Sequence, residues 1–409
     1  TGIRSWDDAH SVAGSWFPAR DACTVPTPTA YILGMQKSGT SSVTLSLGLH
    51  PDLVWPIPLE EDTYVEGPSD GAVVKELHYF DLEIQAGKDI EYYNRHWPDP
   101  LPTEYGVQYI EATPSYLRFA HAARNMKAAY GEEAFAALKF IVILADPTRR
   151  HVSWFNHIQI DQDKRDNNGM IVHDLNADIE SYLLQDPMST EEFVSSCGTW
   201  DCYEGNRLLM GAYAGMLEMW FDVGARPDQF VVVFLEEYLA DTAGVLRRIT
   251  DFLGIREVSL GGSASDDVND VDASSVNRHE HRQVLTPENE ASLRRYYAPW
   301  NCELASLLDR TGIRSWDDAH SVAGSWFPTR EDCVVAPKPT AFILGMQKSG
   351  TTSLSDSLMQ HPDLVWPKRL KEDTYSFGTW GGQVKELHYF DIEIGTGKDI
   401  EYYNRHWPD

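Results

Sequence analysis

Residues 31–42 read YILGMQKSGTSS: an apolar run, a turn of small residues around Gly34 and Gly39, and the start of a helical pattern. An apolar β-branched run that leads into a glycine-rich turn and then a helix is typical of a phosphate-binding loop. Small residues let backbone N–H groups converge on an anion, the helix N-terminus adds a favourable dipole, and Lys37 adds a positive charge. The segment therefore predicts an anion site at the end of a buried strand.

The loop is not a Walker A motif. That motif places its lysine after the last glycine, followed by Ser or Thr, whereas Lys37 here precedes Gly39. The loop therefore gives no reason to expect that the protein binds a nucleoside triphosphate with magnesium. A P-loop kinase is a weaker alternative function. The residues that we expect to hold the anion through backbone N–H groups, hydroxyls or charge are Gln36, Lys37, Ser38, Gly39, Thr40, Ser41 and Ser42.

Apolar strand-like runs alternate with helical patterns along the rest of the chain. The expected strands are 29–33, 107–111, 139–144 and 230–235. The expected helices are 41–49, 122–138, 149–160, 206–221, 242–253 and a terminal amphipathic helix over 293–310, and the polar, acidic run 261–275 is expected to be a loop. This alternation predicts an α/β fold, a P-loop-containing central parallel sheet with helices on both faces, and ligands at the carboxyl ends of the strands.

An internal repeat sets the domain organisation. TGIRSWDDAHSVAGSWFP stands at residues 1–18 and again at 311–328, the phosphate loop returns at 345–353, and GKDIEYYNRHWPD closes both stretches. A period of about 310 residues is far too long for a solenoid, so it indicates a tandem domain duplication. We expect a complete domain over 1–309, the incomplete N-terminal third of a second copy over 310–409, and further copies in a longer parent chain. A swap, in which 311–409 replaces 1–100, is an open alternative.

Composition limits the partners. The chain of 409 residues is 42% hydrophobic, as expected for a globular protein, and its net charge is −28. Such acidity argues against nucleic acid and anionic membranes, and no apolar run is long enough to span a bilayer. The five cysteines have no zinc-site spacing. Cys197 with Cys202, or Cys23 with Cys302, could form disulfides. Cys23 and Cys333 stand at equivalent positions of the repeat, so one unit holds four cysteines, which is also ordinary for a reduced protein.

A second motif, Lys75-Glu76-Leu77-His78-Tyr79-Phe80-Asp81, suggests a base. Together with GMQKSGTSS it resembles the sulfotransferases that use 3′-phosphoadenosine-5′-phosphosulfate (PAPS), most closely the Golgi glycosaminoglycan type, including heparan sulfate 3-O-sulfotransferases. The resemblance implies a fold related to the nucleotide kinases. It also implies that Glu76 is the general base with Lys75 and His78 beside it, and that Lys37 bridges to the leaving oxygen. No metal is implied.

The resemblance also locates a site for the 3′-phosphate of the cofactor. The family pattern is a strand followed by Arg-Asp-Pro-x-x-Arg-x-x-Ser, in which the first Arg and the Ser grip the phosphate. Here Arg150 and Ser153 match, but Ala145 replaces the first Arg. Loss of one charge-assisted contact costs about 1.5–3 kcal/mol. Arg149 or Arg278 could supply the missing charge.

The function expected from these features is PAPS-dependent sulfation of a carbohydrate hydroxyl. The acidic composition favours a neutral or lightly charged glycan. Alternatives are a small hydroxylated metabolite as acceptor, and a weakened or non-catalytic binding module, which Ala145 keeps open. The resemblance implies the Golgi lumen or secretory pathway, and a cytoplasmic location remains an alternative.

Overall fold

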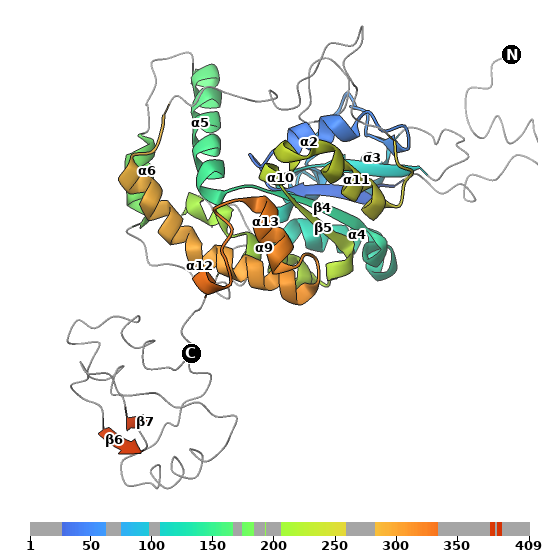
Figure 1. Ribbon diagram of the computed structural model, residues 1–409. Helices are drawn as coiled ribbons and strands as arrows, with labels where there is room; N and C mark the ends of the chain where they lie inside the picture. The colour runs from blue at the N-terminus through green and yellow to red at the C-terminus, as the bar shows by residue number, and fades with distance from the viewer. Residues whose placement is uncertain are drawn as a thin grey trace, which may run out of the picture. The chain divides into compact units, whose positions relative to one another are not determined.

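The computed structural model describes residues 27–62, 75–97, 107–166, 174–183, 193, 206–258 and 283–333, with two short strands at 377–380 and 383–386. Five parallel strands form its main sheet, in the order β2-β3-β1-β4-β5 (Figure 1). Their bounds are β2 (Leu53–Val54), β3 (Gln108–Ala112), β1 (Ala30–Gly34), β4 (Lys139–Leu144) and β5 (Phe230–Phe234). The predicted α/β fold with a central parallel sheet is confirmed, although β2 was not foreseen.

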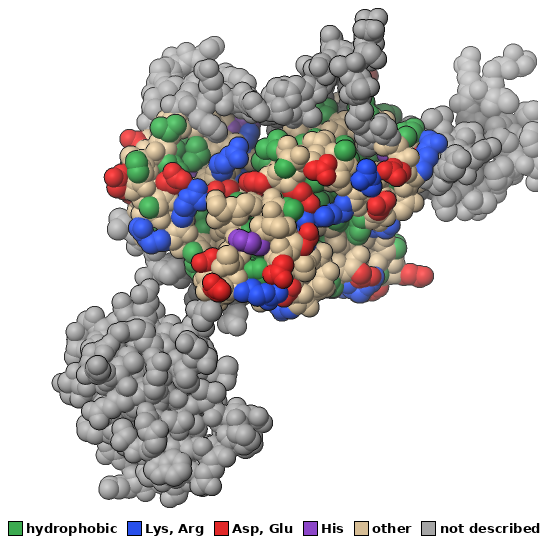
Figure 2. Space-filling view, in the orientation of Figure 1, with side chains coloured by type: hydrophobic (Ala, Val, Ile, Leu, Met, Phe, Trp, Pro, Cys, Tyr) green, Lys and Arg blue, Asp and Glu red, His purple; other side chains and the backbone are tan. Residues whose placement is uncertain are grey.

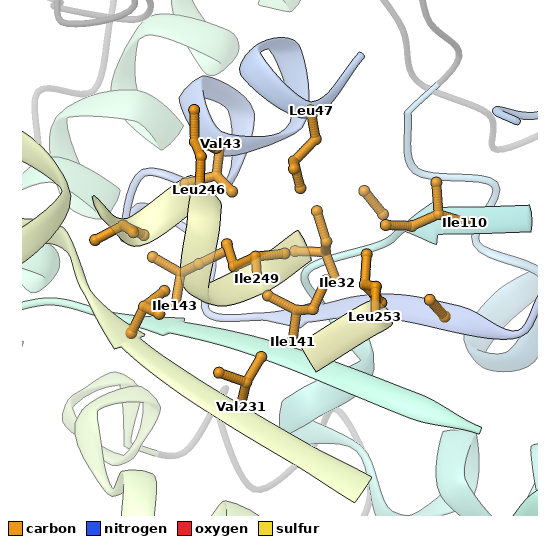
Figure 3. Close-up of a cluster of buried hydrophobic side chains, with 14 of the residues drawn as sticks. Ile32, Val43, Leu47, Ile110, Ile141, Ile143, Val231, Leu246, Ile249 and Leu253 are labelled. Atoms are coloured by element: carbon orange, nitrogen blue, oxygen red, sulfur yellow. The ribbon is translucent and has the colours of Figure 1, made fainter. Parts of the chain in front are cut away.

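One face of the sheet packs against α2 (Thr40–Leu47), α10 (Leu235–Ala240) and α11 (Thr242–Leu253). Val43 and Leu47 of α2 and Ile249 of α11 meet Ile32 and Ile141 of the strands in one buried apolar cluster (Figure 3). Strands buried in this way on both faces must be apolar throughout, which is why β1, β4 and β5 read as nearly continuous hydrophobic runs.

The other face is aromatic and packs against α4 (Ala120–Ala137) and α9 (Tyr213–Val223). The ring of Phe140 on β4 lies 5.0 Å from Trp220 of α9 and 6.0 Å from Phe135 of α4. The ring of Tyr31 on β1 lies 6.3 Å from Phe140. Helices on both faces fix the sheet rigidly and leave the carboxyl ends of its strands to carry the loops.

The remaining helices connect these strands or follow the last of them in the chain. They are α3 (Ile90–Asn94), α5 (Pro147–Asp166), α6 (Leu175–Leu183), α12 (Pro287–Thr311) and α13 (Trp316–Ala323), with single turns η3 (Tyr79–Glu83) and η5 (Arg207–Gly211). The helix expected over 206–221 is therefore the turn η5 followed by α9, because Ala212 leaves helical geometry between them. The acidic loop expected at 261–275 lies outside the described residues.

The first compact unit extends past the boundary that the repeat suggested. Arg310 lies in the last turn of α12, and the chain continues into α13 within the same unit. The division between the two units falls between Thr329 and Arg330. Cys302 and Cys333 are both disulfide-bonded, whereas Cys23, Cys197 and Cys202 lie outside the described residues.

Candidate active site

The loop after β1 has the geometry of an anion cradle. Lys37 and Gly39 both have positive φ, 66° and 87°, and the amide of Ser38 bonds back to the carbonyl of Met35 at 3.1 Å. This tight turn brings the chain directly into α2, whose first residue is Thr40. Successive N–H groups at a helix N-terminus attract anions. Gln36, Lys37 and Ser41 are half-buried, and Ser38, Thr40 and Ser42 are buried.

Gly34 joins this loop to the segment that follows β3. A Cβ on Gly34 would lie 2.8 Å from the carbonyl oxygen of Pro114 and 2.8 Å from Cβ of Leu117. Only glycine permits such a close approach of two backbones. The phosphate loop is thereby held against Pro114, and the residues on either side of that proline, Thr113 and Ser115, contact the second motif.

Glu76 is held at the same edge of the sheet. Its amide donates to the carbonyl of Ala112, the last residue of β3, at 2.8 Å, and Ala112 is in register with Ile32 on β1. The Glu76 carboxylate forms an ion pair with Lys75, and its Oε2 lies 3.6 Å from Nε2 of His78. The Lys75 and Glu76 side chains are each 13% exposed, so the pair is shielded but reachable from solvent.

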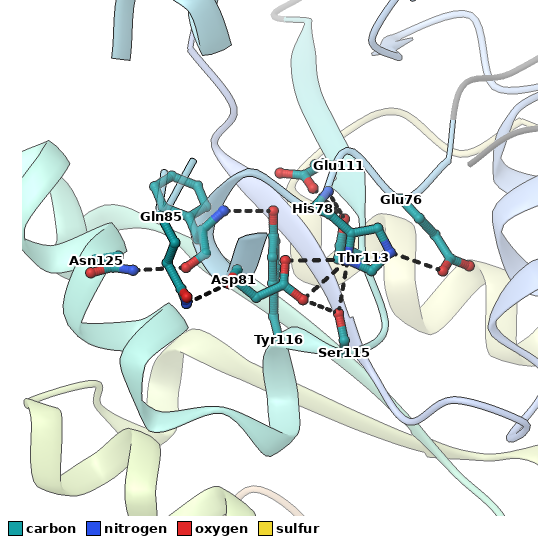
Figure 4. Close-up of polar contacts among 10 residues, drawn as sticks. Glu76, His78, Asp81, Gln85, Glu111, Thr113, Ser115, Tyr116 and Asn125 are labelled. Atoms are coloured by element: carbon teal, nitrogen blue, oxygen red, sulfur yellow. Dashed lines mark hydrogen bonds and ion pairs between the residues drawn. The ribbon is translucent and has the colours of Figure 1, made fainter. Parts of the chain in front are cut away.

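His78 is fixed from its other side. Its Nδ1 lies 3.1 Å from Oδ2 of the fully buried Asp81, and the hydroxyl of Ser115 donates to that same carboxylate (Figure 4). The backbone N–H of His78 donates to Oγ1 of Thr113 at 3.4 Å. A histidine held between two carboxylates presents Nε2 to Glu76 in one orientation.

Burial and charge set the protonation states of the cluster. Burial would raise the pKa of Glu76, but the Lys75 charge and the His78 hydrogen bond outweigh it and lower that pKa to about 2. Burial would lower the pKa of His78, but Asp81 and Glu76 raise it to about 10. At neutral pH the site therefore holds an ionised Glu76 beside a protonated His78.

A further carboxyl lies deeper. Burial raises the pKa of Glu111 to about 7, although Thr113 and Tyr93 donate hydrogen bonds to it. Glu111 is fully buried on β3 and its Thr113 partner contacts His78, so it supports the cluster from below.

The segment after β4 contributes a buried cation. Arg150, on the first turns of α5, is 1% exposed, and in the described part of the chain no carboxylate pairs with its guanidinium nitrogens. Its charge acts on the hydroxyls of Tyr213 and Tyr297 and, after burial, helps to lower the pKa of His151 to about 3. A buried guanidinium without a carboxylate is costly unless an anion binds it. Arg150 therefore suits a phosphate group.

Tyr213 connects this cation to the phosphate loop. Its hydroxyl donates to the carbonyl of Ala145 at 3.0 Å, and Ser38 and Arg150 both influence its pKa, which burial raises. Ala145 itself is 2% exposed, with its side chain inside the protein. Arg149 is exposed and Ser153 half-buried on the same helix, while Arg278 lies outside the described residues.

Backbone strain marks the same residues. Among the residues that the structure describes, three non-glycine residues have positive φ: Lys37 at 66°, Glu76 at 66° and His78 at 52°. A left-handed conformation costs a non-glycine residue about 1–3 kcal/mol and persists only where the surroundings enforce it, commonly at functional sites. All three are residues that the sequence analysis named as catalytic.

Sequence reasoning did not assign roles to three residues that build this site. The spacing of His78 and Asp81, three residues apart in the quoted motif, was an available signal for the pair. Ser115 reaches the site from the segment after β3 and Tyr213 from the start of α9, and no local pattern reveals their partners.

Other features of the described residues lie apart from the cluster. A pocket of about 570 Å³ between α4 and α9 is lined by Arg124, Lys127 and Asp222 among others, and by none of the predicted site residues. Within the described ranges, no group of three or more His, Cys, Asp or Glu side chains could hold a metal, and none of the helices has the length and apolarity to cross a bilayer. Figure 2 shows acidic and basic side chains interspersed on the face displayed.

A parallel sheet with a phosphate-type loop after its central strand, and a carboxylate held by histidine at the same edge, is the arrangement of a P-loop-containing α/β fold. The chain belongs to the sulfotransferase domain family, whose model matches residues 27–275. The family resemblance that the two motifs carried is confirmed.

Curated relatives are heparan sulfate enzymes. The chain is 28% identical over 254 residues to mouse (Mus musculus) heparan sulfate glucosamine 3-O-sulfotransferase 3B1, covering 61% of this chain and 52% of the relative. It is 25% identical over 228 residues to human (Homo sapiens) bifunctional heparan sulfate N-deacetylase/N-sulfotransferase 1, covering 56% and 22% respectively. The chain thus spans about half the length, or less, of these two relatives.

Among solved structures, a sulfotransferase from Alicyclobacillus acidocaldarius is similar, with 21% identity and a TM-score of 0.45 over 69% of this chain and 96% of that one.

Proposed function

We propose that this chain transfers the sulfuryl group of PAPS to a hydroxyl of a carbohydrate acceptor, with Glu76 as general base. The observation that carries the proposal is the ionised Glu76, clamped by Lys75 and His78 at the strand edge that also carries the phosphate loop. Sulfuryl transfer needs a base for the acceptor proton and positive charge for the departing phosphate oxygen. At this edge of the sheet Glu76 is the base, and Lys37 supplies the positive charge.

The residues divide the work of an in-line transfer. Glu76 takes the proton of the acceptor hydroxyl as that oxygen bonds to sulfur. The bond from sulfur to the donor's phosphate oxygen breaks, and its electron pair stays on that oxygen, where Lys37 and the loop N–H groups neutralise the charge. Protonated His78, held by Asp81, keeps Glu76 oriented and ionised. No step requires a metal.

The donor's 3′-phosphate is assigned to the cation after β4. Arg150 supplies the buried guanidinium, with Ser153 on the same helix and Arg149 or Arg278 as outer contacts. Arg150 matches the second arginine of the family pattern, so the charge of the arginine that is missing at Ala145 is assigned to Arg149 or Arg278.

The acceptor class follows from the relatives and from charge. Heparan sulfate appears in the names of the two relatives described above, which favours a sugar hydroxyl. The net charge of −28 repels highly sulfated chains, so a neutral or lightly charged glycan is preferred over heparin-like polymers. A small hydroxylated metabolite is the alternative acceptor. Disulfide-bonded Cys302 and Cys333 fit an oxidising compartment such as the secretory pathway.

A binding module without catalysis is the second candidate, and Ala145 is the feature that favours it. A thermal-shift comparison separates the readings. Stabilisation by adenosine 3′,5′-bisphosphate but not by ATP with magnesium supports the sulfotransferase site and excludes a kinase. No stabilisation by either compound favours the binding module.

Activity is tested with labelled sulfate transferred from PAPS onto neutral, carboxylated and sulfated glycans and onto small hydroxylated compounds. Glu76→Gln should lower the rate by about 10²- to 10⁴-fold, as expected for loss of a general base. Glu133→Gln, an exposed carboxylate on α4, is the matched control and should leave the rate unchanged. A Glu76→Gln variant that keeps full activity would refute the assigned base.

A further inference from the structure

Glu111 is a buried carboxyl that takes no direct part in the proposed transfer. It lies on β3 with no exposed surface. Its Oε1 accepts from Oγ1 of Thr113 and its Oε2 from the hydroxyl of Tyr93, each at 2.5 Å. The hydroxyl of Tyr116 also hydrogen-bonds this carboxyl. None of these three partners is a cation, so the hydrogen bonds must offset the cost of burying the carboxylate.

Two of these hydroxyls also hold the motif that carries the candidate base. The backbone N–H of His78 donates to Oγ1 of Thr113 at 3.4 Å, and the backbone N–H of Phe80 donates to the hydroxyl of Tyr116 at 3.2 Å. Thr113 and Tyr116 thus lie between Glu111 and the motif, with the carboxyl on one side and a backbone amide on the other (Figure 4).

The two hydroxyls need a fixed direction to act as acceptors. A hydroxyl has one proton to donate and lone pairs with which to accept, whereas an ionised carboxyl only accepts. Ionised Glu111 therefore receives the donated hydrogen bond of each hydroxyl and leaves the lone pairs for the two amides. Glu76 and His78 have left-handed φ values of 66° and 52°, which persist only where their surroundings enforce them. The orientation of the Glu76 carboxylate thus depends on Glu111.

The surroundings of Glu111 consist of hydroxyls and one further acid. They come from β1, η3, α3, η4 (Tyr116–Arg118), α4 and the residues after β3, and they are Tyr31, Asp81, Tyr93, Tyr116, Tyr130 and Thr113. Burial and the Asp81 charge raise the pKa of Glu111 to about 7, against the hydrogen bonds that lower it. Glu111 therefore changes its charge near neutral pH, whereas Glu76, with a pKa of about 2, stays ionised.

We propose that Glu111 is a positioning residue for sulfuryl transfer, whose ionised carboxyl orients the hydroxyls of Thr113 and Tyr116 so that they hold Glu76 toward the acceptor. The inference rests on the proposed function, because it concerns the orientation of the base which that function requires. A protonated Glu111 donates one hydrogen bond and so accepts fewer. The two hydroxyls then lose their fixed direction, and Glu76 is held less well.

Hydrogen exchange tests the positioning without any assumption about the reaction. At about pH 9, where Glu111 is ionised in the wild type, Glu111→Gln should speed exchange of the backbone amides of residues 76–83 about ten-fold, measured by mass spectrometry. The glutamine has the shape of the glutamate but one acceptor and one donor. Thr113→Val, which removes one of the two hydroxyls, should have the same effect and is the test if Glu111→Gln does not fold.

Tyr130→Phe is the matched control for exchange. The hydroxyl of Tyr130 bonds that of Tyr31 at 2.6 Å, in the same cluster but without a bond to Glu111. Its loss should leave exchange of residues 76–83 unchanged. Unchanged exchange in Glu111→Gln and Thr113→Val, or equal acceleration in Tyr130→Phe, would overturn the proposal whatever the protein catalyses.

The pH profile of sulfate transfer tests the link to catalysis. In the wild type, kcat should fall about 10- to 100-fold in a partial step as the pH drops through about 7, far above the pH at which Glu76 is protonated. Glu111→Gln should lack this step and show the lower kcat throughout, with the KM for PAPS within a few-fold of wild type. Tyr130→Phe should keep the step.

The outcomes separate this inference from the proposed function. A wild type without the step, or a step that persists in Glu111→Gln, contradicts the role of Glu111. Full activity in Glu76→Gln, or no sulfate transfer by the wild type, contradicts the proposed function instead. In that case the exchange of residues 76–83 still decides whether Glu111 holds the motif.

Discussion

Nδ1 of His78 lies 3.1 Å from Oδ2 of Asp81, a carboxylate that is wholly removed from solvent. This contact, three residues along one turn, turns the opposite nitrogen of the imidazole toward Glu76 and keeps the ring protonated at neutral pH. The candidate base is therefore oriented by a chain of charged contacts that runs from buried Asp81 through His78 to Glu76.

Removing the charge of Lys75 should shift the pH dependence of activity. Lys75 lowers the pKa of Glu76, which stands at about 2, so Lys75→Met raises that pKa toward the ordinary value of 4.5. The acid limb of the kcat/KM profile is then expected at higher pH than in the wild type. Lys88→Met, on the loop before α3 and away from the cluster, is the control. An unmoved acid limb in Lys75→Met would show that Glu76 does not control the rate.

The charge of His78 should make the free energy of unfolding decrease as the pH becomes alkaline. Its pKa is about 10 in the folded protein against an ordinary value of 6.5, so the folded state binds the proton more tightly. The stabilisation is complete below about pH 6.5 and is lost as the pH rises through 10. His78→Gln should remove this part of the decline, measured as the free energy of unfolding in urea at pH 6 to 10. An identical decline in the variant argues against the prediction.

Substitutions of Arg150 and of Arg149 should have different effects on the affinity for the cofactor. Arg150→Met removes the buried guanidinium and is expected to weaken adenosine 3′,5′-bisphosphate about 10- to 150-fold, the value of one or two charge-assisted contacts. Its Tm without ligand should not fall, because a buried cation without a carboxylate is itself destabilising. Arg149→Met, on the exposed side of the same helix, should bind within a few-fold of wild type by calorimetry. Equal losses of nucleotide affinity in the two variants would indicate that the 3′-phosphate does not bind at the buried Arg150 guanidinium.

Gly34 should tolerate no side chain. An added Cβ would lie 2.8 Å from the Pro114 carbonyl oxygen, which is backbone and cannot rotate away. Gly34→Ala should therefore push the phosphate loop from the segment after β3, with loss of both stability and nucleotide binding, by about 2 kcal/mol or more in unfolding. Gly131→Ala is the control for backbone strain alone: its added Cβ meets nothing within 4 Å, but its φ of 76° strains an alanine, so it should lose stability and keep nucleotide binding. Unfolding in urea and nucleotide titration measure the two effects, and unchanged binding in Gly34→Ala would contradict the role of this contact.

The sequence by itself determined four of the five strands of the main sheet, the glycine-rich loop after the first of them and the family. These depend on local features, namely periodicity, glycines in a turn and the short motif around Glu76, so they can be read along the chain. It also revealed the repeat, because stretches of identical residues can be recognised without a structure.

The tertiary structure alone decided which distant residues meet. Ser115 reaches Asp81, Tyr213 reaches Ala145, and Arg150 is buried rather than solvated, because sheet order and helix packing bring together segments that are far apart in sequence. It also placed residues 311–328 with the preceding unit rather than with the copy that follows. A repeat in sequence gives only the period of a duplication. The burial of Arg314 against Glu237 and of Trp326 against Phe234 is what defines where the folded unit ends.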